Sequence, residues 1–66
     1  MRKILRNARI DAKMRQTDVA NYLGISLRMY QCIESGAKLG AIKHWDKLED
    51  LFRISQRELR KNTDNY

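Results

Sequence analysis

The chain has 66 residues, which is enough for one small domain with a marginal hydrophobic core. A charged fraction of 33%, no proline and three glycines indicate an all-helical bundle with short turns, and disfavour a strand-rich or disordered chain. One cysteine and one histidine leave no intramolecular disulfide and no usual structural zinc set, so we expect no metal and no cofactor.

The chain is strongly basic, and its charge is unevenly distributed along the sequence. Fourteen Lys and Arg against eight Asp and Glu give +6, and residues 1–15 alone carry six basic and one acidic residue. We expect a polyanion as partner because basic clusters contact phosphates, the alternative being surplus charge that maintains solubility. The basic start has no apolar run, and no stretch reaches about 18 apolar residues. We therefore expect a cytosolic protein without a membrane span.

The first periodic segment predicts an amphipathic helix over about residues 2–13. Its apolar positions recur at helical spacing, at Ile4, Leu5, Ala8 and Ala12. The stripe is thin, and Arg9 lies at its border.

A second helix is predicted over residues 16–23, where Val19, Ala20 and Leu23 fall on one face. Gly24 follows the last periodic residue. Because glycine adopts a left-handed backbone conformation without Cβ strain, we expect it to end this helix in a sharp turn.

A third helix is predicted over residues 27–35, with Ser26 as N-cap and Gly36 after its end. Helical spacing places Tyr30, Ile33 and Glu34 on an inner arc, and the opposite face carries Arg28, Gln31, Cys32 and Ser35. Arginine pairs with guanine edges and glutamine with adenine edges, so this face suits DNA. A merely solvated face is the alternative.

Two further helices are predicted, over about residues 43–52 and 56–62. The fourth has apolar residues at spacings of three and four, at Ile42, Trp45, Leu48, Leu51 and Phe52. Lys38 and Lys43 flank its start, where a helix N-terminus attracts anions, so we expect phosphate contacts there; ordinary solvated lysines are the alternative. We assign no role to His44.

The fifth helix has Ser55 and Glu58 at the spacing of a capping box, and its Leu59 should complete the core. Residues 63–66 are expected to form a frayed tail.

The centre of the chain resembles the helix-turn-helix of the Cro/CI type, the lambdoid phage repressor and xenobiotic-response-element family. The residues that carry the resemblance are Gln16, Ala20, Leu23, Gly24, Ile25, Ser26, Tyr30, Ile33, Glu34 and Gly36. It extends over about residues 3–61. The resemblance implies a compact five-helix, lambda-repressor-like DNA-binding domain that takes up residues 1–66.

The resemblance also implies roles for individual residues. The base-facing positions are Leu27, Arg28, Gln31 and Cys32. Residues expected to contact the DNA backbone are Arg15, Gln16, Ser26, Lys38 and Lys43.

Three of these positions depart from the family pattern. Leu27 and Cys32 stand where hydrogen-bonding side chains are frequent, so Leu27 presses on a thymine methyl or simply packs. Cys32 is expected to be a small residue tolerated close to DNA, with a redox switch as the alternative. Arg15 occupies the usual cap position but cannot accept a hydrogen bond, so the cap can fall to another residue.

The resemblance places an Arg–Glu ion pair between the first and third helices, and Arg9 and Glu34 match its positions. An unpaired carboxylate on the inner arc would be costly, which independently calls for a partner. Trp45 is expected either in the core or at a dimer contact.

The function implied is a sequence-specific transcription regulator, most like a phage or mobile-element repressor, that binds an inverted-repeat DNA operator as a homodimer. An antitoxin-type protein-interaction module and a restriction–modification controller are the alternatives on the same fold. An enzyme is not expected, because the sequence offers no nucleophile–base pair, paired carboxylates or glycine-rich phosphate loop.

Overall fold

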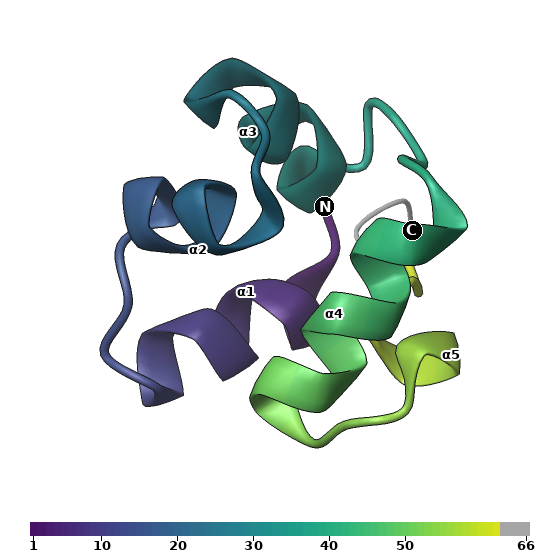
Figure 1. The fold of residues 1–66 in the computed structure, drawn as a ribbon. Helices are drawn as coiled ribbons and strands as arrows, with labels where there is room; N and C mark the ends of the chain where they lie inside the picture. The colour runs from purple at the N-terminus through teal and green to yellow at the C-terminus, as the bar shows by residue number, and fades with distance from the viewer. Residues whose placement is uncertain (63–66) are drawn as a thin grey trace.

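The protein is all-helical in the computed structural model, which describes residues 1–62. The residues expected as a frayed tail, 63–66, lie outside the described part. The helices follow one another in the order α1 (Lys3–Asp11), α2 (Gln16–Leu23), α3 (Leu27–Ser35), α4 (Ile42–Phe52) and α5 (Gln56–Leu59) (Figure 1). The expected all-α class is confirmed for these residues, and none of their helices has the length and apolar character that a membrane span requires.

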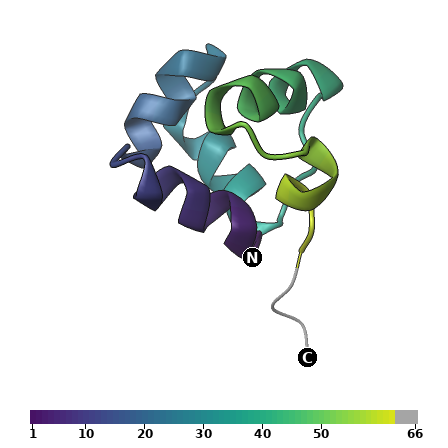
Figure 2. The same ribbon diagram turned by 90° about the horizontal axis from the view of Figure 1, so that it is seen from below.

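The helices surround one hydrophobic core, with α2 and α3 on one side of the molecule and α4 and α5 on the other (Figures 1 and 2). Trp45 and Tyr30 are the largest fully buried side chains. The remaining core residues are Leu5, Ala8, Val19, Ala20, Leu23, Ile33, Leu48 and Leu59. Leu59 completes the core as predicted, and Trp45 takes the core position, one of the two places expected for it.

The segment from α2 to α3 forms as the sequence predicts, with both helices at their expected bounds. Gly24 adopts φ 74° and ends α2, while the N–H groups of Gly24 and Ile25 donate to the last carbonyls of that helix. Ser26 caps α3, its Oγ accepting from Met29 N at 3.1 Å. Gly36, at φ 92°, follows the end of α3.

The first helix ends at Asp11, two residues earlier than predicted. Lys13 adopts a left-handed conformation, φ 59°, and its N–H donates to the carbonyl of Ile10, while Met14 N–H donates to that of Arg9. This pair of bonds is the glycine-type helix ending, made here by a lysine. The prediction was wrong because no glycine in the sequence marks the end.

The fourth helix begins at Ile42, one residue before the predicted start. His44, to which no role was assigned, is buried, and its Nδ1 accepts the N–H of Ala41 at 3.3 Å. An acceptor three residues into a helix that reaches back to the cap residue fixes the first turn. Ile42, predicted as part of the apolar stripe, is instead 73% exposed.

The fifth helix ends at Leu59 rather than at residue 62. The carbonyl of Arg60 accepts a hydrogen bond from Arg2 Nε at 2.9 Å, so it serves a tertiary contact. Ser55 is the N-cap, as expected, but its Oγ accepts from Arg57 N, and the carboxylate of Glu58 contacts Lys61. The predicted capping box between Ser55 and Glu58 is therefore not formed.

Candidate nucleic-acid interface

Helix α3 has two faces of opposite character. Tyr30, Ile33 and Glu34 are buried against the rest of the molecule. The outward side carries Leu27, which is 40% exposed, and the exposed polar side chains of Arg28, Gln31 and Ser35, with Cys32 half-buried at the margin. The predicted division into an inner arc and an outer polar face is confirmed.

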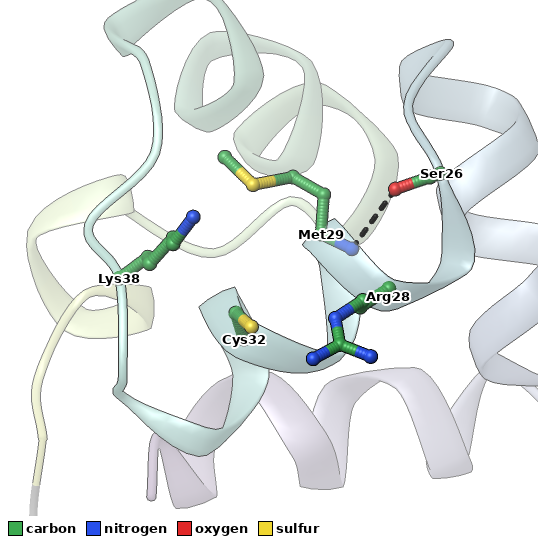
Figure 3. A pocket seen from close by; sticks show the side chains of 5 residues that line it. All are labelled: Ser26, Arg28, Met29, Cys32 and Lys38. Atoms are coloured by element: carbon green, nitrogen blue, oxygen red, sulfur yellow. Dashed lines mark hydrogen bonds between the residues drawn. The ribbon is translucent and has the colours of Figure 1, made fainter.

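An open hollow of about 260 Å³ lies beside α3. It is lined by the residues drawn in Figure 3, which are Ser26, Arg28, Met29, Cys32 and Lys38. In that view Arg28 from α3 and Lys38 from the following loop lie on either side of Cys32. Two cationic side chains that line one hollow favour an anionic partner. Four of the nine predicted DNA-contacting residues meet here.

The predicted ion pair between α1 and α3 is present. Arg9 Nε donates to Glu34 Oε1 at 2.8 Å, with side-chain exposures of 13% and 3%. Arg9 also donates through Nη1 to the carbonyl of Met14 at 2.9 Å. This ion pair is largely shielded from solvent and connects the inner arc of α3 to α1. Loss of either partner would leave the other charge buried without a counter-charge.

Glu34 accepts two further hydrogen bonds from neutral groups. The Tyr30 hydroxyl donates to Oε1 at 3.2 Å, and Gln16 Nε2 donates to Oε2 at 2.6 Å. Burial, and secondly the charge of Glu34, raises the pKa of Tyr30, so its hydroxyl keeps the proton that it donates. The side-chain NH₂ group of Gln16, a residue expected at the DNA backbone, thus donates to a buried carboxylate within the protein.

The carbonyl oxygen of the Gln16 side chain contacts a second residue of α3. Gln16 Oε1 accepts a hydrogen bond from Gln31 Nε2 at 3.2 Å, in an exposed position. The structure therefore brings together two residues to which the sequence assigned separate roles, one at a phosphate and one at a base.

Arg15 is the N-cap residue of α2, and its contacts are with Asp18, three residues along the chain. Asp18 Oδ2 accepts the Arg15 N–H at 2.8 Å, and the two side chains form an exposed ion pair at 3.3 Å. The hydrogen bond from the Arg15 backbone is the main reason that the pKa of Asp18 is lowered. The N-cap therefore remains Arg15, without a capping side-chain hydrogen bond, and Asp18 supplies only the bond back to the N–H of Arg15; the Arg15 side chain is 83% exposed.

The two lysines around the start of α4 occupy different places. Both side chains are exposed, but Lys38 borders the hollow beside α3, whereas Lys43 belongs to the first turn of α4 and is not among the residues that line the hollow.

Arg2 is a residue whose role the sequence did not indicate. It is 5% exposed, and its guanidinium donates to the carbonyls of Ile33, Lys38 and Arg60. The backbone N–H of Arg2 also donates to the carbonyl of Glu34 at 2.8 Å, so Arg2 stabilises the end of α3. Two of the six N-terminal basic residues, Arg2 and Arg9, therefore hold the fold together and are not free for a polyanion.

Within residues 1–62, no group of three or more His, Cys, Asp or Glu side chains is arranged to hold a metal ion. Comparison of the chain with protein-family models, with curated proteins and with solved structures gives no match.

Proposed function

We propose that this protein binds double-stranded DNA in a sequence-specific manner and regulates transcription, most like a small repressor of the Cro/CI type. The second and third helices act as a helix-turn-helix, and α3 enters the major groove. The expected family membership, the operator and the homodimer belong to this proposal.

One observation carries the proposal: α3 is fixed through its inner face while its outer face is polar and open. Tyr30, Ile33 and Glu34 are buried, whereas Arg28 and Gln31 are exposed. The major groove is about 12 Å wide and accommodates a helix, and arginine and glutamine are the side chains that pair bidentately with guanine and adenine. A helix presented in this way can read bases without rearrangement of the core.

The charges around α3 support the same partner. Arg28 and Lys38 border the hollow, and the exposed side chains of Arg15 and Lys43 lie on neighbouring segments. Cations at these positions favour phosphates on both sides of a groove, and they make the affinity fall as salt rises.

A dimer fits this scheme. A small domain with one α3 reads a short half-site, so two copies related by a twofold axis would place two recognition helices about 34–36 Å apart on an inverted repeat. Two half-sites together supply the affinity and specificity that one small domain lacks.

The experiment is selection of binding sites from random duplex DNA with the purified protein at physiological salt. Enrichment of an inverted repeat supports the proposal if the preference at one of its base pairs is relaxed in Arg28→Ala but kept in the matched charge variant Arg6→Ala on α1. No enrichment, with binding that disappears as salt rises, contradicts sequence-specific recognition.

One observation favours the alternative of a protein-interaction module, such as an antitoxin. Leu39 and Ile42, between α3 and the first turn of α4, are 58% and 73% exposed. Neighbouring exposed apolar side chains are typical of protein contacts. If Leu39→Ser together with Ile42→Ser abolished function in cells while DNA selection stayed intact, a protein partner at this surface would be favoured.

A further inference from the structure

A continuous row of hydrogen bonds connects the buried ion pair to the outer face of α3. Arg9 and Tyr30 donate to Glu34, Glu34 accepts from Gln16 at 2.6 Å, and Gln16 accepts from Gln31 at 3.2 Å. The row begins at a carboxylate that is 3% exposed and ends at an exposed amide, so it reaches from the interior to the proposed DNA-reading surface.

The chemistry of Glu34 fixes the direction of every bond in this row. An ionised carboxylate only accepts, so the Gln16 amide must turn its NH₂ group inward and its carbonyl oxygen toward α3. That oxygen can only accept, so the Gln31 amide must turn its NH₂ group toward Gln16. A free glutamine side chain has no such preference between its two ends.

The Gln31 amide keeps one N–H and its carbonyl oxygen for an outside partner. In a primary amide only the N–H cis to the carbonyl oxygen lies on the same edge as that oxygen, so this donor–acceptor edge is free when the trans N–H is the one bonded to Gln16. A donor beside an acceptor matches N7 and the N6 amino group of adenine, whereas guanine presents two acceptors at N7 and O6.

We infer that Gln31 selects an adenine in the major groove, and that Gln16 and Glu34 are the positioning residues that set the polarity and orientation of its amide. This inference rests on the proposed function. It gives Gln16 a different role from the phosphate contact that the family resemblance implies, because both ends of its amide are bonded within the protein.

The test uses the site selected by the wild-type protein and its single-base-pair variants. Affinities are measured for the wild type, Gln16→Ala, Gln31→Ala and the double variant, with Thr17→Ala as control because Thr17 is an exposed neighbour on α2. Melting curves verify that each variant is folded. If Gln16→Ala fails to fold, Gln16→Met, which keeps the length of the side chain, takes its place.

In Gln31→Ala we expect the preference for adenine at one base pair, measured as a ratio of affinities, to fall by about fivefold or more. Gln16→Ala should weaken the preference at that same base pair, and the double variant should lose no more than Gln31→Ala alone, because the two residues act as a unit. Thr17→Ala should keep all preferences. In the free protein, the side-chain amide resonances of Gln31 should shift in Gln16→Ala and stay in place in Thr17→Ala.

Three different results would contradict three different parts of the proposal. A wild-type protein that selects no site contradicts the proposed function itself. If a site is selected but Gln16→Ala lowers the affinity equally for all sequences, Gln16 contacts phosphate and the positioning role is wrong. If Gln31→Ala changes a preference for a base other than adenine, or none, the assignment of Gln31 is wrong.

Discussion

The guanidinium of Arg2 lies over the indole ring of Trp45, 5.3 Å from the ring centroid. The same guanidinium donates to three main-chain carbonyls from α3, the following loop and the end of α5, while Trp45 Nε1 donates to the carbonyl of Leu39 at 2.8 Å. Arg2 and Trp45 thus connect the end of α3, the loop that follows it, α4 and the end of α5. A cation over an aromatic ring, largely removed from water, adds to these hydrogen bonds.

Arg2→Ala is therefore expected to destabilise the fold by about 2 kcal/mol or more, because it leaves buried carbonyls without donors. Urea unfolding monitored by circular dichroism measures the difference. Arg6→Ala removes the same charge from an exposed position of α1 and should change the free energy of unfolding by less than about 0.5 kcal/mol. Equal stabilities of the two variants would contradict the structural role of Arg2.

Arg9→Ala should lower the free energy of unfolding by about 3–5 kcal/mol, since it leaves the Glu34 carboxylate buried without its cation. The exposed pair Lys61–Glu58 is the comparison, with side-chain exposures of 51% and 45%. Lys61→Ala should cost less than about 1 kcal/mol. A melting temperature of Arg9→Ala equal to that of the wild type would contradict the role of the ion pair.

Stability should fall with pH below about 6.5 because of His44. Burial, followed by the charges of Lys43 and Lys47, lowers the pKa of His44 in the folded protein. The unfolded chain then takes up the proton first as the pH decreases, so stability is full above the ordinary pKa and is lost progressively below it. Protonation would also place a proton on Nδ1, where the ring accepts the N–H of Ala41.

His44→Gln tests this dependence, because a glutamine three residues into the helix can accept the same N–H without titrating. Melting temperatures between pH 7.5 and 5.5 should decline less in this variant than in the wild type. An identical decline in both proteins would assign the pH dependence to other groups.

Arg28 and Lys43 should affect DNA binding in different ways. Arg28→Ala is expected to cost about 1–3 kcal/mol on the selected site and to relax the preference at one base pair. Lys43→Ala should weaken all sequences alike and reduce the salt dependence of the affinity. Competition binding with single-base-pair variants measures both. If the preference survives unchanged in Arg28→Ala, the reading face is wrongly assigned.

Local sequence signals predicted the central part of the fold well. Gly24, Ser26 and Gly36 fix helix ends through their own backbone or hydroxyl chemistry, so α2 and α3 were predicted at their observed bounds. The pairing of Arg9 with Glu34 was also predictable, because an inner-arc carboxylate needs a cation and the family resemblance supplied the partner.

The remaining features depend on contacts between distant segments. Arg2 looks like any other residue of a basic N-terminus until the ends of α3 and α5 come near it. Lys13 ends α1 in a conformation that glycine usually adopts, so no residue type at this position marks the end of the helix. The contact between Gln16 and Gln31 requires the packed arrangement of α2 and α3.

Whether α3 reads DNA is tested by a nuclear magnetic resonance titration of the labelled protein with duplex DNA carrying the selected site. We expect saturable shifts concentrated at the outward residues of α3, Leu27, Arg28 and Gln31, and at Lys38, with a much weaker response to a scrambled duplex. Shifts concentrated on α5 or the outer side of α1, or equal responses to the two duplexes, would contradict a DNA-reading role of α3.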